Sequence, residues 1–258
     1  MIMKTLLIKL VQDLGEQLEL RRRQKDWSLI DKGEDGVATS ADIEAEKTIV
    51  SFCQKHFPEI KSWGEEQTKE VDENDIDNAG KYWLIDPIDG TNNFVNGLGF
   101  YCISIALCQG RDILLGLVYN PVEKTYFFAK KNEGAIYFNG IEEVALSGHK
   151  QKKASECLFS PGRLRAKREP IGIESQILDP LQQECRAIRR LGAAAWEICL
   201  CAGGILDGFW QYGLKPWDIA AGLLIARESG LIVRDYDNLE ATPFSKTILV
   251  LPEHLMNI

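Results

Sequence analysis

Apolar residues recur at helical spacing in two segments near the start of the chain. Residues 4–22 place leucine and valine three and four positions apart, which predicts an amphipathic helix. Residues 42–57 repeat the pattern, with Asp42 as a cap or first-turn acid, and a proline follows where that helix should end. Between the two helices, residues 31–36 are rich in turn formers and predict a loop or hairpin.

The middle of the chain changes to short apolar runs separated by turn residues. Residues 82–86 form an apolar run of strand length. Three β-rich runs follow and predict an antiparallel meander. These runs are residues 101–108, 113–120 and 125–130. Residues 134–146 should add a further strand, with a turn at their Asn-Gly pair.

Helices and strands alternate in the rest of the chain, which is typical of α/β layering. The predicted helices are 174–184, 193–203 and 217–229. The predicted strands are 155–160, 185–190, 206–212, 231–235 and 246–251. A polar, charged stretch at 147–155 separates the two patterns. We therefore expect an N-terminal α+β half, 1–150, with most candidate metal ligands, and a C-terminal α/β half, 151–258.

The segment Trp83-Leu-Ile-Asp86-Pro-Ile-Asp89-Gly90-Thr91 ends the first apolar run with two carboxylates three residues apart. Carboxylate oxygens suit hard cations such as Mg²⁺. The intervening proline has φ fixed near about −65°, so the acids are less free than in an ordinary loop. Backbone N–H groups at Gly90 and Thr91 could open a helix and face an anion. The segment predicts a place where metal and phosphate meet; a turn capped by Asp89 or Thr91 is the alternative.

Composition narrows the classes of function. The 258 residues carry a formal net charge of −8, with 45% hydrophobic and 26% charged residues, as in ordinary soluble proteins. This acidity argues against nonspecific nucleic-acid binding, and an acidic protein needs cations to act on phosphates. Seven scattered cysteines indicate reduced thiols and a cytoplasmic location. No segment suits a membrane span or a signal peptide, so we expect no membrane partner.

Three further motifs accompany the Asp86–Thr91 segment. They are Val37-Ala-Thr39-Ser-Ala-Asp42, Gly64-Glu65-Glu66 and Trp217-Asp218-Ile-Ala-Ala-Gly222. Singly, each has an ordinary interpretation as a helix cap or a solvated turn. Together and in this order, over roughly residues 5–252, they resemble the inositol monophosphatase family of Mg²⁺-dependent, lithium-sensitive phosphatases. The resemblance implies an αβαβα sandwich of the inositol monophosphatase and fructose-1,6-bisphosphatase type, assembled as a homodimer.

The resemblance also implies roles for individual residues. It assigns two or three Mg²⁺ ions to Glu65, Asp86, the backbone carbonyl of Ile88, Asp89 and Asp218. Asp86 would bridge two ions, and Glu65 would also support a third, mostly hydrated one. Thr91 and Asp42 would orient the water that attacks phosphorus. Lys32 matches a family lysine near that water, although a solvent-exposed lysine is the alternative.

Substrate contacts would lie on both halves of the chain. They are Gly90, Thr91, Gly192, Ala193, Ala194, Gln211 and Asp218. At the position of Gln211, inositol-selective members commonly carry a glutamate that accepts hydrogen bonds from the ring hydroxyls. An amide brings a donor and no charge, so strict inositol selectivity is either lost or unchanged.

The expected reaction is direct attack of water on a small phosphate monoester, inositol 1-phosphate or a related sugar or polyol phosphate. Fructose 1,6-bisphosphate, 3′-phosphoadenosine 5′-phosphate and histidinol phosphate are alternatives within the family. The basic residues at 163–168 and 189–190 would meet a second phosphate or form a solvated face. A non-catalytic binding or regulatory protein is the alternative of another class, against which the complete set of candidate ligands argues.

Overall fold

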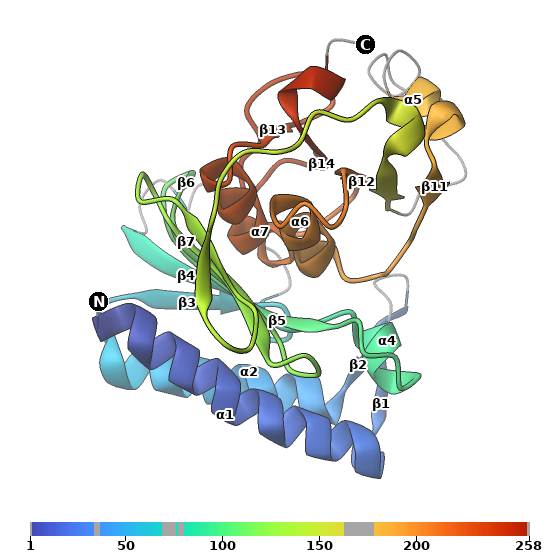
Figure 1. Ribbon diagram of the computed structural model, residues 1–258. Helices are drawn as coiled ribbons and strands as arrows, with labels where there is room; N and C mark the ends of the chain where they lie inside the picture. Colours follow the sequence, from blue (N-terminus) through green and yellow to red (C-terminus); the bar gives the residue numbers. More distant parts are fainter. Residues whose placement is uncertain (1, 34–36, 69–75, 77–79, 163–177, 257–258) are drawn as a thin grey trace.

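The computed structural model describes residues 2–33, 37–68, 76, 80–162 and 178–256. Its elements stack as helices, sheet, helices, sheet and helix (Figure 1). The αβαβα sandwich expected from the sequence is therefore confirmed. Within the described ranges, no helix is long and apolar enough to cross a membrane.

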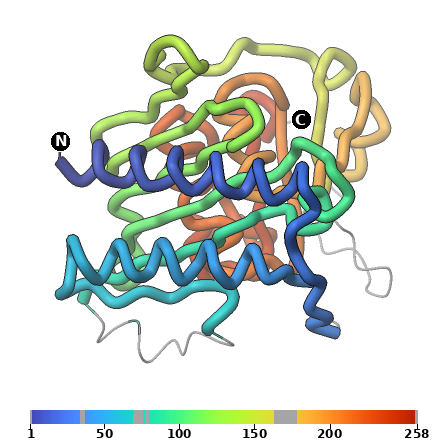
Figure 2. The backbone as a smooth tube through the Cα atoms, turned by 90° about the horizontal axis from the view of Figure 1, so that it is seen from below, coloured from blue at the N-terminus to red at the C-terminus, as the bar shows by residue number. Residues whose placement is uncertain are grey.

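Two long helices form the first layer, α1 (Ile2–Gln24) and α2 (Ser40–His56). Figure 2 shows them side by side across one face of the first sheet. The short antiparallel strands β1 (Leu29–Asp31) and β2 (Val37–Thr39) join them as the expected hairpin, whose tip lies outside the described residues. Thr39 caps α2, and Asp42 completes a capping box by accepting the Thr39 N–H.

The first sheet has seven strands in sequence order. They are β3 (Lys61–Gly64), β4 (Lys81–Asp89), β5 (Cys102–Gln109), β6 (Asp112–Asn120), β7 (Thr125–Lys130), β8 (Ala135–Phe138) and β9 (Glu143–Leu146). Only β3 and β4 pair in parallel, so the antiparallel meander is confirmed. Residues 134–146 form two strands rather than one, because their Asn-Gly pair turns the chain back on itself.

A β-bulge in β4 places the two aspartates of the central motif on one face of the sheet. Asp86 lies opposite Ser104 and Asp89 opposite Cys102, so Pro87 and Ile88 together face a single residue of β5. Residues three apart on a regular strand point to opposite faces, and one extra residue cancels that difference. A proline is tolerated there because a bulge leaves a backbone position unpaired. The strand expected to end at residue 86 therefore continues to 89.

The second sheet has five strands and both parallel and antiparallel pairs. In spatial order they are β11 (Ala187–Ile188), β10 (Leu158–Pro161), β12 (Gly208–Tyr212), β14 (Thr247–Leu251) and β13 (Ile232–Arg234). The strand expected at 155–160 begins only at 158, because residues 154–156 form a 3₁₀ turn. The strand expected at 185–190 shortens to two residues.

Three helices belong to this half, of which α6 (Ala194–Ala202) and α7 (Pro216–Glu228) fill the layer between the sheets. Helix α5 (Asp179–Glu184) lies on the outside of the second sheet (Figure 1). The first part of the helix expected at 174–184, and nearly all of the basic segment 161–172, lie outside the described residues. One apolar core joins α6 and α7 to both sheets. The division into halves at residue 150 stays a prediction.

Candidate active site

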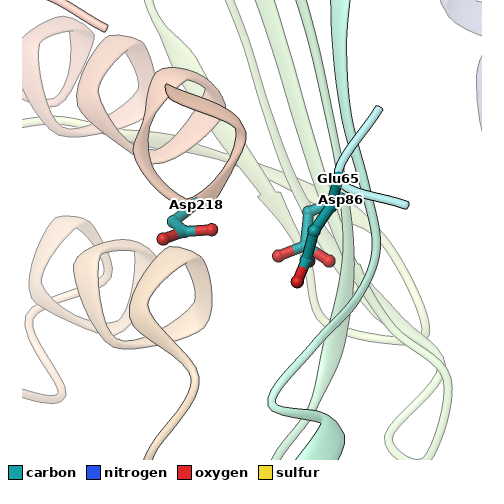
Figure 3. A group of neighbouring side chains, drawn as sticks. All are labelled: Glu65, Asp86 and Asp218. Carbon is teal, nitrogen blue, oxygen red and sulfur yellow. The ribbon is translucent and has the colours of Figure 1, made fainter. Parts of the chain in front are cut away.

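Three carboxylates from distant parts of the sequence converge between the two sheets. Glu65 follows β3, Asp86 lies on β4, and Asp218 lies in the first turn of α7 (Figure 3). Each contributes one oxygen to a group whose members all lie within 4.8 Å of one another. The structure thus brings together three of the predicted metal ligands.

Local hydrogen bonds hold two of these acids in place. The Asp86 Oδ1 atom accepts the Ile88 N–H at 3.0 Å, and this hydrogen bond closes a turn within the bulge. The Asp218 Oδ2 atom accepts the Lys215 N–H at 2.8 Å, as the third helical residue of a capping arrangement. Asp218 is therefore not the N-cap of α7, and its other oxygen remains available to the cavity.

A buried glutamate that sequence reasoning missed supports the third acid. Glu46 on α2 is fully buried and accepts the Glu66 N–H at 2.7 Å and the Gln67 N–H at 3.0 Å. A side chain at Gly64 would place its Cβ 2.2 Å from the Glu46 carboxyl carbon, so any larger residue there would force the Glu46 carboxylate to move. Glu46 thereby fixes the turn that presents Glu65.

Lys32 lies against this acidic turn rather than in open solvent. Its Nζ is 3.0 Å from a Glu65 oxygen and 2.8 Å from a Glu66 oxygen. Burial alone would lower the pKa of Lys32, but the neighbouring carboxylates raise it above its usual value. Burial raises the pKa of Glu66 to about 7, against the lowering effect of its hydrogen bond from Lys32. The lysine offsets charge on the glutamates.

The remaining negative charge of the cluster fits a divalent cation. Burial, followed by the charge of Glu65, raises the pKa values of Asp86 and Asp218 well above the usual range. In the described part of the chain, neither aspartate forms an ion pair. A set of oxygen donors with uncompensated charge is the kind of site that Mg²⁺ occupies.

Asp89 is turned toward helix α6 instead of joining the three converging oxygens. Its Oδ1 accepts the Ala194 N–H at 3.0 Å, and its Oδ2 accepts the Ala195 N–H at 2.7 Å and the Trp196 N–H at 3.4 Å. The Cys102 thiol adds a contact at 3.5 Å. Unsatisfied amides at a helix start attract an anion, which explains this orientation. Burial raises the pKa of Asp89 to about 7, although the thiol and the amides lower it.

Thr91 and Asp42, the two residues that the resemblance assigns to orienting the attacking water, form a hydrogen-bonded pair. The Thr91 Oγ1 atom lies 2.9 Å from Asp42 Oδ1 and 3.1 Å from the Ile88 carbonyl oxygen. One hydroxyl proton serves these two acceptors, and the oxygen keeps lone pairs for an incoming donor. Burial raises the pKa of Asp42. Gly90, with φ of +97°, makes the left-handed turn between the bulge and the short helix α4 (Thr91–Val95).

Glu65, Asp86, Asp89 and Asp218 line one cavity of about 440 Å³, whereas Asp42, Glu46 and Glu66 do not. The cavity is also lined by Gly162, Arg190, Gly192, Gln211 and Leu214. The predicted substrate residues Gly192 and Ala194 line it, whereas Ala193 is buried behind. Arg190 lines the cavity and Arg189 does not, and the basic segment 163–168 lies outside the described residues.

Glu197 completes the cavity lining and was also missed from the sequence. It is the only charged residue of the apolar helix α6. A lone acid inside an apolar helix is a signal of a buried, hydrogen-bonded carboxylate that sequence reasoning could have used. Glu46 lies one helical turn beyond Asp42 on the buried face of α2, but α2 carries several other charged residues, so its sequence gives no such signal.

Comparison with known proteins assigns this fold and cavity to a family. The profile of the inositol monophosphatase family matches residues 3–257. The chain belongs to the inositol monophosphatase family, and it is a phosphoric monoester hydrolase.

Its relatives carry two kinds of name. The fructose-1,6-bisphosphatase/inositol-1-monophosphatase of Thermotoga maritima is 32% identical over 94% of this chain and 88% of its own length. The Nus factor SuhB of Vibrio cholerae is 36% identical over 80% of this chain and 74% of its own length. Among solved structures, the suhB protein of Bartonella henselae has a TM-score of 0.87 at 27% identity, covering 100% of this chain and 96% of that one.

Proposed function

We propose that the protein hydrolyses a small phosphate monoester, inositol 1-phosphate or a related sugar or polyol phosphate, with Mg²⁺ as cofactor. The observation that carries this proposal is the convergence of Glu65, Asp86 and Asp218 in the cavity that also contains Thr91. The names of relatives, which include an inositol monophosphatase from Dictyostelium discoideum at 31% identity, support the substrate class.

The three converging acids would hold the metal. Asp86 would bridge two ions, and the Ile88 carbonyl and Asp89 would complete the ligand set. Asp89 can do so only with lone pairs that its bonds to α6 leave free. When bound, Mg²⁺ would offset the charge of the phosphate and make a water molecule more acidic. A third ion at Glu65 would share that carboxylate with Lys32, whose Nζ lies 3.0 Å from one of its oxygens.

The Thr91–Asp42 pair would position the attacking water. The hydroxyl oxygen of Thr91 accepts a hydrogen bond from water while its own proton points to Asp42. Asp42 is 1% exposed and its other oxygen is bound to Thr39, so the pair is held rigidly. Positioning of this kind, combined with charge stabilisation, supplies most of the catalysis of phosphoryl transfer.

A phosphate-release panel with Mg²⁺ and with a chelator tests the proposal. The substrates are inositol 1-phosphate, fructose 1,6-bisphosphate, 3′-phosphoadenosine 5′-phosphate and histidinol phosphate. We expect Mg²⁺-dependent release from inositol 1-phosphate, and loss of at least about 100-fold in Asp218→Asn. Asp112→Asn, which changes an exposed aspartate paired with Lys131, is the matched control and should retain full activity. Release that is independent of Mg²⁺ would contradict the metal assignment.

The relatives named Nus factor SuhB support a second candidate, a regulatory protein on this fold. The same panel separates the two, because a purely regulatory protein would release phosphate from none of the four substrates. The homodimer, the lithium sensitivity and the cytoplasmic location stay predictions, as does the absence of a nucleic-acid partner.

A further inference from the structure

Glu197 is buried in the helix that borders the substrate wall. Its side chain is 2% exposed, and every residue of α6 around it is buried. A carboxylate in such a place is costly unless its oxygens accept hydrogen bonds. The hydrogen bonds that Glu197 accepts therefore indicate its structural role.

The Glu197 carboxylate binds the loop that precedes its own helix. Its Oε1 accepts the Leu191 N–H at 3.0 Å, and its Oε2 accepts the Gly192 N–H at 3.1 Å and the Ala193 N–H at 3.2 Å. The Ser160 hydroxyl of β10 contacts Oε1 as well. Glu197 thus ties loop 191–193 to both α6 and the second sheet.

The next three amides are held by the other buried acid. Asp89 accepts the N–H groups of residues 194–196, so six successive amides, 191–196, donate to two carboxylates. Asp89 belongs to β4 and to the proposed metal site, whereas Glu197 belongs to the substrate half. Of these two carboxylates, only that of Glu197 accepts hydrogen bonds from the amides of residues 191–193.

Loop 191–193 reaches the cavity through Gly192, whereas Leu191 and Ala193 do not line it. Gly192 lines the cavity together with Gln211 and Gly162, and it adopts φ of +78°, which favours glycine. Its amide and that of Ala193 point into Glu197, so they are not donors to a ligand in this arrangement. The shape of the wall follows from the position of the Glu197 carboxylate.

We propose that Glu197 is a positioning residue that fixes loop 191–193 and thereby selects the alcohol portion of the substrate. Its effect is exerted through the loop, because both carboxylate oxygens already accept hydrogen bonds from the amides of residues 191–193 and from Ser160. The inference rests on the proposed phosphatase function for its kinetic consequence. Its structural part, the hold on the loop, is independent of that function.

The kinetic test is Glu197→Gln, which keeps the shape of the side chain but turns one acceptor into a donor. We expect KM for inositol 1-phosphate to rise about tenfold, as one lost hydrogen bond to a charged group would cause, with kcat nearly unchanged. Hydrolysis of glycerol 2-phosphate, which has no ring to meet the wall, and the Mg²⁺ dependence should change less than twofold. Glu228→Gln is the matched control, because Glu228 likewise accepts two backbone amides, at 2.8 Å each, from Asn132 and Gly134 outside the cavity.

Amide hydrogen exchange tests the structural part without any substrate. In Glu197→Gln the amides of residues 191–193 should exchange about tenfold faster or more, while those of 194–196, held by Asp89, keep their rates. Unchanged exchange at 191–193 would overturn the proposal. So would faster exchange with unchanged KM, or an equal loss of kcat/KM on both substrates. If the wild-type protein hydrolyses nothing, the proposed function fails while the exchange result still decides whether Glu197 holds the loop.

Discussion

The metal-free protein should become more stable when Asp86 is changed to asparagine. Asp86 is 2% exposed, has no basic partner in the described structure, and contributes an oxygen within 4.8 Å of oxygens from Glu65 and Asp218. The asparagine oxygen can still accept the Ile88 N–H, so the bulge keeps its hydrogen bond. The substitution therefore removes a buried charge and little else.

The magnitude follows from the geometry. Two like charges 4.8 Å apart repel by about 3.5 kcal/mol at an effective dielectric constant of 20. Lys32 partly offsets the charge of Glu65, and Asp89 and Asp218 are further negative neighbours of Asp86. Protonation of the cluster limits the cost, because the pKa values of both aspartates are raised. We expect Asp86→Asn to gain about 1–3 kcal/mol of unfolding free energy near neutral pH in a chelator.

Urea unfolding with and without Mg²⁺ measures the stability gained by removing the charge and the stability gained by binding the ion. At a Mg²⁺ concentration of about 100 times the dissociation constant, the wild type should gain about 2.7 kcal/mol. The variant should gain almost nothing, so Mg²⁺ should reduce or reverse the difference in unfolding free energy between the variant and the wild type. A variant that is less stable than the wild type in chelator, or that gains as much from Mg²⁺, would refute this account of the cluster.

Three further results are expected. Thr91→Val removes the hydroxyl that contacts Asp42 and should lower kcat roughly 100-fold or more, whereas Thr91→Ser should retain most of the wild-type kcat. A valine variant with near-native kcat would show that the Thr91–Asp42 pair does not take part in catalysis. Gly64→Ala should force Glu46 from its amides and cost about 1–3 kcal/mol by urea unfolding, and an unchanged midpoint would contradict that packing. Because the folded pKa of Asp89 is raised to about 7 from 3.8, the folded state binds more protons than the unfolded chain between these values. The chelated protein should therefore gain stability as the pH falls from about 8 to 5, and a flat profile would contradict it.

The sequence predicted the layers and the identity of the converging acids. Helical and strand periods are local properties, so α1, α2 and the meander could be located from spacing alone. The edge strand β3 could not, because its four residues begin with the polar pair Lys61-Ser62 and it pairs with a neighbour on one side only. Local patterns carry little information about such short edge strands.

Two features of the site also depend on tertiary contacts that the sequence does not display. The bulge at Pro87 is defined by its pairing with β5, and without it Asp86 and Asp89 would point to opposite faces. The direction of the Asp89 carboxylate depends on the position of helix α6, whose first residue lies more than a hundred positions later. The resemblance made both aspartates metal ligands, with Asp86 as the bridging one, and in the structure only Asp86 joins the three converging oxygens.

The split origin of the acidic cluster has a consequence for the order in which the molecule matures. Glu65 and Asp86 belong to the first sheet, whereas Asp218 lies in the last fifth of the chain. During synthesis the first sheet could fold before α7 is made, but the three-oxygen metal site would form only when α7 adds Asp218. A cation would then bind only after the two halves had docked, and its binding energy would oppose their separation. The ion would stabilise only the fully folded protein, and the stability of a partly synthesised chain would not depend on Mg²⁺.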